Sequence, residues 1–428
     1  MLLIKGGRII DPLSGADGTG DILIDGEKIV KIGKDISCGC KVIDAGGLAV
    51  CPGFVDIHSH FRDPGQTHKE DIYTGAAAAA AGGYTTVICM ANTLPPVDNA
   101  DTLQYILDRA KDADIEVLQA ACITQGLRGG ELTDFDALLQ AGAVGFSDDG
   151  KGISNPQTVL EAMREAAKSD AVLSFHEEDS RLIEDPGVNS GPAAARLGLK
   201  GAPAAAEEIL IARDAVLAAE TGCRIHIQHV SSALSVDMIR QAKRMGAHIT
   251  AEATPHHLSL TEVAVHERGT SAKVNPPLRA EQDRLAIIAG LKDGTIDAIA
   301  TDHAPHAAAE KDVPFAQAPS GMIGLETAFA VCMTYLVRPG HITLNQLIYK
   351  LTAGPAGIYS LDRGYIREGG RADITIFDPA EEWQVSGFRS KSANSPYMGA
   401  QLTGKIKKTI CSGRVVYTEE RGKRIDDR

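Results

Sequence analysis

Aromatic residues and long apolar stretches are both scarce in this 428-residue sequence. Phe, Tyr and Trp make up only 4% of the chain, whereas there are 44 glycines. This balance is typical of folds with many short turns, in which glycine supplies positive φ angles. The alanine run 76–81 predicts helix, and it is far shorter than the roughly 20 apolar residues that cross a bilayer. Residues 1–7 have too little apolar length for a signal peptide. We therefore expect a cytoplasmic protein without a membrane partner.

The chain also lacks a stripe of lysine and arginine that could follow a phosphate backbone. Its 43 basic residues are outnumbered by 56 acidic ones, which gives a formal net charge of −13. This absence argues against nucleic acid or an anionic membrane as a partner. We interpret the negative charge as a source of solubility.

Cysteine pairs with metal-binding spacing are missing, apart from Cys38-Gly-Cys40. That pair could bind a metal, but no second Cys or His pair lies nearby in the sequence. The eight cysteines are scattered, and several stand within apolar runs. We therefore expect reduced, buried thiols.

Both ends of the sequence have the pattern of short β-strands. β-branched stretches are separated there by glycine-rich turns, and Asp25-Gly26 is a hairpin signal. The two ends are therefore predicted to form one small β-sandwich domain, residues 1–52 plus 365–428. The strand candidates are 2–4, 21–24, 29–32, 372–377, 409–411 and 415–417.

The middle of the chain alternates between apolar strand-like runs and helical patterns. Eight such alternations over roughly 300 residues predict an α/β fold, a (β/α)8 TIM-type barrel, which we place at residues 53–364. A doubly wound open sheet is the structural alternative, but no Gly-x-Gly-x-x-Gly turn follows a strand. The strand candidates are Phe54–His58, Thr85–Met90, Glu116–Ala121, Ala143–Ser147, Leu173–His176, Arg224–His229, Ile249–Ala253 and Ala298–Thr301.

Most reactive side chains follow directly on these strand candidates. In a barrel, the carboxyl ends of the strands form the active-site face. The first strand ends in His58-Ser59-His60. Because alternate residues of a strand point the same way, both imidazoles can reach one metal ion. A His-x-His pair alone is weak evidence, but its place at the end of the first barrel strand makes it much stronger.

Four more strand ends present a carboxylate or an imidazole, the ligand types of Zn²⁺ and similar ions. Each residue taken singly is more often structural, and Asp148-Asp149 could instead form a cap or turn. Their coincidence at one face predicts a metal centre. His226 faces the opposite side and is interpreted as structural, and His256-His257 receives no ligand role. The residues at these strand ends are Asp148, Asp149, His176, His229 and Asp302.

These motifs are similar to those of the amidohydrolase superfamily and, within it, of the bacterial type I dihydroorotases. The similarity runs nearly from end to end of the chain, and several motifs are highly specific in combination. They include PGFVDIHSHFRDPG (52–65), MANTLPP (90–96), GFSDDG (145–150), SFHEED (174–179), HIQHVSS (226–232), KVNPPLR (273–279), TDHAPH (301–306) and GGRADITIFDP (369–379).

The resemblance implies a zinc hydrolase with one or two metal ions. His58 and His60 would bind one ion, and His176 and His229 the second. Asp149 would bridge two ions or support one. Asp302 would be both a ligand and the general acid–base. The substrate contacts that the resemblance implies are His60, Arg62, Asn92, Asn275, His306, Ser320 and Gly321.

The implied reaction is the reversible cyclisation of N-carbamoyl-L-aspartate to L-dihydroorotate in pyrimidine (UMP) biosynthesis. A metal lowers the pKa of bound water toward ~7, and Asp302 would pass the proton to the leaving nitrogen. The guanidinium of Arg62 can bind a carboxylate bidentately. Dihydroorotate has a ring carboxylate, whereas hydantoin and dihydrouracil have none. An ion pair with Asp63 or Glu70 is the alternative interpretation of Arg62.

Related dihydropyrimidinases, allantoinases and some dihydroorotases bridge two metals with a carboxylated lysine. Lys151 lies past Gly150 in the turn after the fourth strand, so we predict an aspartate bridge and no modified lysine. A hydantoinase or allantoinase is one alternative, and Arg62 argues against it. A non-catalytic scaffold for a transcarbamoylase is another, and the complete ligand set argues against that. The resemblance also suggests a homodimer or association with aspartate transcarbamoylase. The loop 307–319 is predicted to close over bound substrate.

Overall fold

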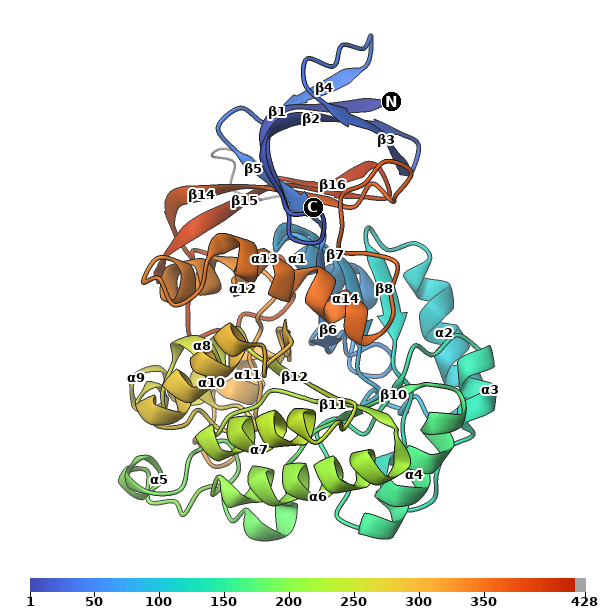
Figure 1. Ribbon diagram of the computed structural model, residues 1–428. Coiled ribbons are helices and arrows are strands. Elements are labelled where there is room, and N and C mark those ends of the chain that lie inside the picture. The colour runs from blue at the N-terminus through green and yellow to red at the C-terminus, as the bar shows by residue number, and fades with distance from the viewer. Residues whose placement is uncertain (420–428) are drawn as a thin grey trace.

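The computed structural model describes residues 1–419, which form a barrel of parallel strands joined to a smaller, mostly antiparallel sheet (Figure 1). Residues 420–428, the end of the predicted small domain, lie outside the described residues. Within residues 1–419, no helix is both long enough and apolar enough to cross a membrane.

Eight parallel strands form the barrel, in chain order. Their bounds are β6 (Phe54–Ser59), β7 (Tyr84–Cys89), β8 (Glu116–Gln119), β9 (Phe146–Ser147), β10 (Val172–Phe175), β11 (Arg224–Ile227), β12 (Ile249–Ala253) and β13 (Ala298–Ile299). Strands β6 to β8 pair in one run and β9 to β13 in another. Two parallel bridges close the ring: Ala121 pairs with Phe146, and Ser59 pairs with His303. The predicted (β/α)8 TIM-type barrel is confirmed.

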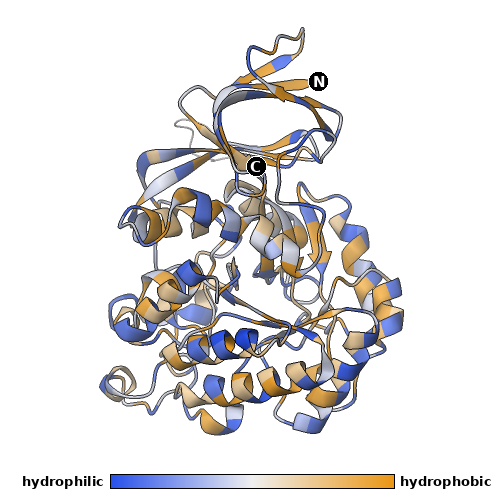
Figure 2. Ribbon diagram, in the orientation of Figure 1, coloured by the Kyte–Doolittle hydropathy of each residue, from blue (hydrophilic) through white to orange (hydrophobic). Residues whose placement is uncertain are grey.

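Helices cover the outside of the barrel. They are α1 (Ile72–Ala81), α2 (Ala100–Ala110), α3 (Phe135–Gln140), α4 (Pro156–Lys168), α5 (Pro192–Arg196), α6 (Ala205–Thr221), α7 (Ala233–Arg244), α8 (Pro255–Ser259), α9 (Ala264–Arg268), α10 (Glu281–Asp293), α11 (Ala308–Lys311), α12 (Ala328–Cys332), α13 (Leu344–Leu351) and α14 (Ala353–Ile358). Helix α7 begins where the Ser232 side chain accepts the amide of Ser235. It buries Val236 and Ile239 and shows a largely hydrophilic surface (Figure 2). Amphipathic helices of this kind cover the apolar strands.

The two chain ends form one sheet, which confirms a small β domain built from both termini. Its strands are β1 (Leu2–Asp11), β2 (Ala16–Asp25), β3 (Lys28–Gly33), β4 (Lys41–Asp44), β5 (Ala49–Pro52), β14 (Ile374–Gln384), β15 (Gln401–Cys411) and β16 (Arg414–Thr418). The order is β16-β15-β14-β5-β1-β2-β3, with β4 beside β1. Strand β14 joins the two halves by pairing with β5. The predicted hairpin is present, because Asp25 pairs with Lys28 and Gly26 has a φ of 56°.

The boundaries 1–52, 53–364 and 365–428 stay predictions. Part of the last range returns to the barrel after β14. The side-chain amide of Asn394 donates to the carbonyls of Ala304 and Gly321, each at 3.1 Å. This segment therefore helps to hold the backbone of two barrel loops.

Cysteine behaves as expected in the core but not at the surface. Six cysteines are buried free thiols. Cys38 and Cys40 instead form a disulfide, so the prediction of reduced, buried thiols is wrong for this pair. Both residues lie in a partly exposed turn before β4 rather than in the apolar core. Their Cα atoms are 5.3 Å apart, within the usual range for disulfides.

Candidate metal centre and substrate cavity

The carboxyl ends of the first, fourth and last barrel strands bring two histidines and two aspartates together. His58 Nε2 lies 3.2 Å from Asp149 Oδ1 and 3.6 Å from Asp302 Oδ1. His60 Nε2 lies 3.1 Å from Asp302 Oδ1 and 3.4 Å from Asp149 Oδ2. All four side chains are buried. Both imidazoles of the His-x-His pair therefore face the same carboxylates.

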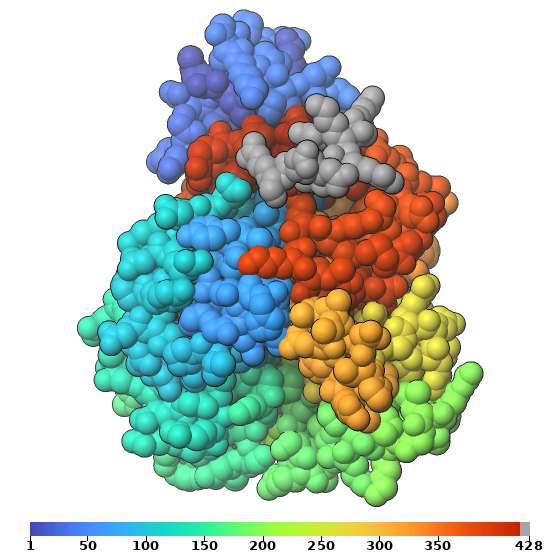
Figure 3. Space-filling model, turned by 180° about the vertical axis from the view of Figure 1, so that it is seen from behind, coloured from blue at the N-terminus to red at the C-terminus, as the bar shows by residue number. Residues whose placement is uncertain are grey.

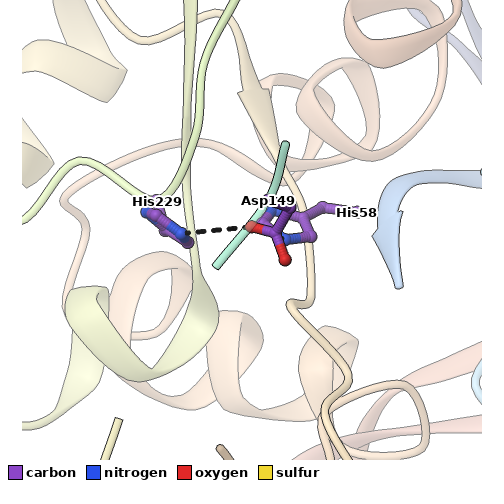
Figure 4. Close-up of side chains that lie close together, drawn as sticks. All are labelled: His58, Asp149 and His229. Carbon is purple, nitrogen blue, oxygen red and sulfur yellow. Dashed lines mark ion pairs between the residues drawn. The ribbon is translucent and has the colours of Figure 1, made fainter. Parts of the chain in front are cut away.

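Two further histidines approach Asp149 from its other side. His176 Nδ1 lies 3.6 Å from Asp149 Oδ1, and His229 Nε2 lies 3.8 Å from the same oxygen. The two histidine nitrogens are 2.9 Å apart. Figure 4 shows Asp149 between His58 and His229. Asp149 thus stands where one carboxylate can reach both pairs of imidazoles.

The residues present fit a divalent metal ion. In each of two groups, His58–Asp149–His229 and His58–His60–Asp302, the ligand atoms lie within 4.8 Å of one another. Within residues 1–419, His58 Nε2 is buried without a hydrogen-bond partner, despite its closeness to Asp149. A buried polar atom without a partner points to a ligand from outside the chain. Neutral imidazoles and carboxylates are the donors that Zn²⁺ and similar ions take.

The electrostatics of the cluster favour a cation. Burial disfavours a charged His58, but Glu252, Asp149 and Asp302 outweigh it and raise its pKa well above the usual value. Burial also opposes ionisation of Asp302, yet His58 and His60 hold its pKa below the ordinary value. Asp302 is therefore a carboxylate at neutral pH. The carboxylates that favour a proton on His58 equally favour a metal ion at the same point.

The two aspartates after β9, Asp148 and Asp149, have different roles. Asp148 Oδ1 accepts the backbone amides of Ile123 at 2.8 Å and Thr124 at 3.1 Å. It therefore holds the loop after β8, while Asp149 points into the cluster. Lys151 is exposed in the following turn, and it does not line the cavity that contains His60, Asp149 and Asp302.

Glu252 orients His58, and it was not among the residues expected from the sequence. Its Oε1 lies 2.5 Å from His58 Nδ1, and its Oε2 lies 3.0 Å from His226 Nε2. A hydrogen bond from Nδ1 fixes the tautomer that leaves Nε2 free for a metal. His226 thus contacts Glu252 and, through it, the candidate ligand His58, rather than facing away from the cluster as expected. Its structural interpretation stays a prediction. The one sequence signal was an isolated acid inside the strand candidate 249–253.

Replacing Glu252 by glutamine should weaken metal binding by about 10- to 100-fold. The amide can no longer accept a charge-assisted hydrogen bond from His58, so the imidazole loses its fixed tautomer. Dialysis against graded Zn²⁺ buffers measures the Kd. Glu165→Gln, at a partly exposed position on α4, is the matched control. Equal Kd values for both variants and the unmodified protein would reject this role.

A cavity of about 380 Å³ lies over the candidate ligands, within the size range of small-molecule sites. On one wall, Ser320 Oγ donates to Asn275 Oδ1 at 3.0 Å, and His306 Nε2 lies 2.9 Å from the Ser320 carbonyl oxygen. Lys273 also lines the cavity and was not expected there. The lining residues include Arg62, Asn92, Asn275, His306, Ser320 and Gly321.

Arg62 lies in the cavity wall rather than in a surface ion pair. Its Nε donates to the carbonyl of Pro305 at 3.4 Å. The two acids considered as alternative partners are engaged elsewhere: Asp63 pairs with Arg109 at 2.9 Å, and Glu70 lies 3.4 Å from His303. The guanidinium is therefore available to a ligand in the cavity.

Asn92 is positioned differently from a simple substrate contact. Its Oδ1 lies 2.9 Å from His60 Nδ1, and its Nδ2 donates to Asp149 Oδ2 at 3.0 Å. Asn92 therefore orients two candidate metal ligands while it lines the cavity. Its amide has the donor and the acceptor that these two contacts require.

Three residues of the site have a left-handed backbone. Arg62, His229 and Asp302 have φ angles of 59°, 32° and 45°. Such angles cost roughly 1–3 kcal/mol for residues other than glycine, and they persist where surrounding structure holds them. Packing and hydrogen bonds of the surrounding structure therefore hold these three residues in place.

The segment 307–319 contributes Ala316, Ala318 and Pro319 to the cavity wall. It is part of the orange surface in Figure 3. Lys273 Nζ donates to the carbonyl of Phe315 at 2.8 Å. In return, Lys311 Nζ donates to the carbonyl of Thr270 at 3.0 Å. These two hydrogen bonds connect the segment to residues 270–273. Its closure over bound substrate stays a prediction.

Comparison with known proteins shows the family to which the chain belongs. Residues 47–235 match the sequence profile of the family described as Dihydro-orotase-like. The chain is 57% identical over 424 residues to a dihydroorotase of Clostridium acetobutylicum, covering 98% of this chain and all of that protein. A dihydroorotase of Clostridioides difficile is 55% identical, with 97% and 100% covered. The chain belongs to the dihydroorotase family.

Solved structures show how the dihydroorotase family relates to other amidohydrolases. An L-hydantoinase of Arthrobacter aurescens has a TM-score of 0.87 at 26% identity, with 97% of this chain and 95% of that one covered. A dihydropyrimidinase of Brevibacillus agri has a TM-score of 0.84 at 23% identity, with 96% and 94% covered. The second likeness is one of fold alone. This chain shares its overall fold with both of these solved structures.

Proposed function

We propose that this chain is a dihydroorotase, which interconverts N-carbamoyl-L-aspartate and L-dihydroorotate on the route to UMP. One observation carries the proposal: Arg62 lines the same cavity as His60, Asp149 and Asp302. A ring carboxylate bound by Arg62 would place the ring amide beside the candidate metal ligands. The relatives named dihydroorotase, at 57% and 55% identity, support the same activity.

We infer that the cofactor is Zn²⁺, one or two ions per chain. His58, His60 and Asp302 would hold one ion and His176 and His229 the other, with Asp149 between them rather than a carboxylated Lys151. When bound, the metal polarises the amide carbonyl and lowers the pKa of water.

Asp302 is the group placed to move a proton. It lines the cavity, and its Oδ1 lies 3.1 Å from His60 Nε2. In hydrolysis, a water proton passes to this carboxylate as the new C–O bond forms. The same proton reaches the ring nitrogen as the C–N bond breaks. Cyclisation reverses these steps: the reacting carboxylate takes up one proton from solution, the ureido nitrogen loses a proton to Asp302 and attacks the carboxyl carbon, and the proton on Asp302 leaves with the hydroxyl group as water.

The other residues would bind and orient the substrate. Arg62 would hold the carboxylate that does not react. His306, which follows the Pro305 carbonyl that Arg62 contacts, would complete the carboxylate pocket, and Asn275 would border the ring where both contact Ser320.

Initial rates with L-dihydroorotate, and with hydantoin for comparison, test the proposal. We expect turnover of dihydroorotate that chelation abolishes and Zn²⁺ restores, and none with hydantoin. Turnover of hydantoin alone would keep the metal chemistry and reject the substrate. No turnover of either, with metal bound, would favour the scaffold alternative.

We also propose a cytoplasmic location, and a homodimer or association with aspartate transcarbamoylase. These proposals rest on the family resemblance. Sedimentation of the purified chain, alone and with the transcarbamoylase, would reject the association if a single slow species persists in both experiments.

A further inference from the structure

A second cavity adjoins the substrate cavity at the carboxyl end of the barrel. Its volume is about 650 Å³. The two cavities have four lining residues in common: Gly150, His176, Pro186 and Asn275. We call the larger cavity the vestibule. Its walls come from the loops after β8, β9 and β10, which carry residues 127–129, 150–155 and 176–186.

The vestibule carries two cations whose charges are not paired. Arg128 donates through Nε to the carbonyl of Gln125 at 3.2 Å, and this contact leaves its two Nη groups for a ligand. Lys151 is exposed, and the carboxylate whose charge interacts with it, Asp148, is buried behind the wall and bonded to the amides of Ile123 and Thr124. Glu178 is the one carboxylate in the described wall, and it lies 3.0 Å from His176 Nε2. The wall therefore has an excess of positive charge.

This local charge is opposite to that of the chain as a whole. The formal net charge is −13, which repels anions from most of the surface. N-carbamoyl-L-aspartate is a dianion at neutral pH, since both of its carboxyl groups are ionised. It takes up one proton on cyclisation, so dihydroorotate is a monoanion. The negatively charged protein therefore repels N-carbamoyl-L-aspartate more strongly than dihydroorotate.

Segment 307–319 contributes no residue to the wall of the vestibule. Its residues Ala316 and Pro319 line the substrate cavity, and neither of them lines the vestibule. The four common residues include His176, a candidate metal ligand. A molecule in the vestibule is therefore next to the reactive groups without crossing segment 307–319.

We propose that Arg128 and Lys151 form an anion-capture site, which binds a carboxylate of N-carbamoyl-L-aspartate before the molecule reaches Arg62 and the metal ligands. The proposal rests on the proposed dihydroorotase function. Both side chains would contact the substrate only while it moves toward Arg62, and neither would touch a reacting atom. Their charges raise the local concentration of the dianion in a protein that otherwise repels it.

The test is the double variant Arg128→Glu/Lys151→Glu, with kcat and KM measured against ionic strength. We expect kcat/KM to fall about tenfold at ~10 mM salt, through a higher KM at unchanged kcat. The difference should shrink to about twofold or less at ~0.5 M salt, because ions screen exposed charges. Both directions have one equilibrium constant, so kcat/KM must fall by the same factor in each.

Two control variants isolate the position of the charges from their number. Lys34→Glu/Lys41→Glu makes the same change in net charge at exposed sites of the β domain. Arg128→Lys/Lys151→Arg keeps both charges in the vestibule. We expect both controls to keep the salt dependence of the unmodified enzyme. Thermal melting checks folding, and the two single variants supply the measurement if the double variant unfolds.

The salt dependence decides the proposal. An unchanged slope in the double variant, an equal loss in the Lys34/Lys41 control, or a fall in kcat rather than a rise in KM would each overturn the capture site. These outcomes leave dihydroorotate turnover in the unmodified enzyme intact. Absence of that turnover would instead overturn the proposed function itself, so the two failures are distinguishable.

Discussion

Replacing Asp302 by asparagine is expected to lower kcat for dihydroorotate hydrolysis by about 10⁴-fold, the upper end of what a general acid–base supplies. Asparagine keeps the shape of the side chain, but its amide cannot accept a proton from water. The substitution also removes one negative charge from the candidate metal ligands. Burial opposes ionisation of Asp302, and the nearby histidines hold its pKa low enough that the native group is ionised and ready to accept the proton.

Metal content and a control variant separate the two roles of Asp302. Metal analysis of the purified variant shows how much of the loss comes from an empty site, and rates are then compared at saturating Zn²⁺. Asp312→Asn changes an exposed aspartate of the same loop region that does not line the cavity. We expect that control to stay within twofold of the unmodified enzyme, since isolated surface changes have small effects. A kcat within tenfold of normal in Asp302→Asn, with full metal content, would contradict the proton-transfer role.

Replacing Arg62 by methionine is expected to lower kcat/KM for dihydroorotate by about 10²- to 10³-fold, as for other buried charge pairs that lose one partner. The substrate carboxylate would enter a cavity without its bidentate donor. Dihydrouracil has the same ring without the carboxylate, so its slow turnover, if measurable in the unmodified enzyme, should hardly change. The specificity ratio between the two substrates is the measurement.

Arg62→Lys is the matched comparison for the methionine variant. Lysine keeps the charge but not the planar fork of donors, so we expect a partial recovery of kcat/KM. Equal losses with dihydroorotate and dihydrouracil would mean that Arg62 supports its loop rather than the carboxylate. The comparison is needed because Arg62 has a left-handed backbone, with a φ of 59°, so a substitution there can also disturb the loop.

The arrangement of the barrel could be predicted from local patterns. Apolar runs such as 224–229 alternate with helical segments such as 234–245, and each run became a strand near its expected place. Parallel strands in a closed ring must end at one face. For that reason, residues far apart in the chain, such as His58 and Asp302, could be expected together before any contact was known.

The local patterns could not predict which of two neighbouring polar residues has which role. Asp148 and Asp149 are adjacent and chemically identical, and only the loop after β8 gives Asp148 its two amide donors. Asn92 was expected at the substrate but also holds His60 and Asp149. These choices depend on side-chain rotamers and on partners from other loops, which local sequence patterns do not encode.

Local sequence patterns were enough to predict the order of strands and helices and the polar residues at strand ends, and the resemblance supplied the expected chemistry. Local periodicity and short motifs carry that information because they depend on neighbours within a few residues. The tertiary structure decided that Glu252 orients His58, that Cys38 and Cys40 pair, and that Arg128 and Lys151 border a cavity next to His176. Glu252, Arg128 and Lys151 gain their roles from groups brought near by ring closure and loop packing, and the pairing of Cys38 with Cys40 depends on the exposed turn in which folding places them.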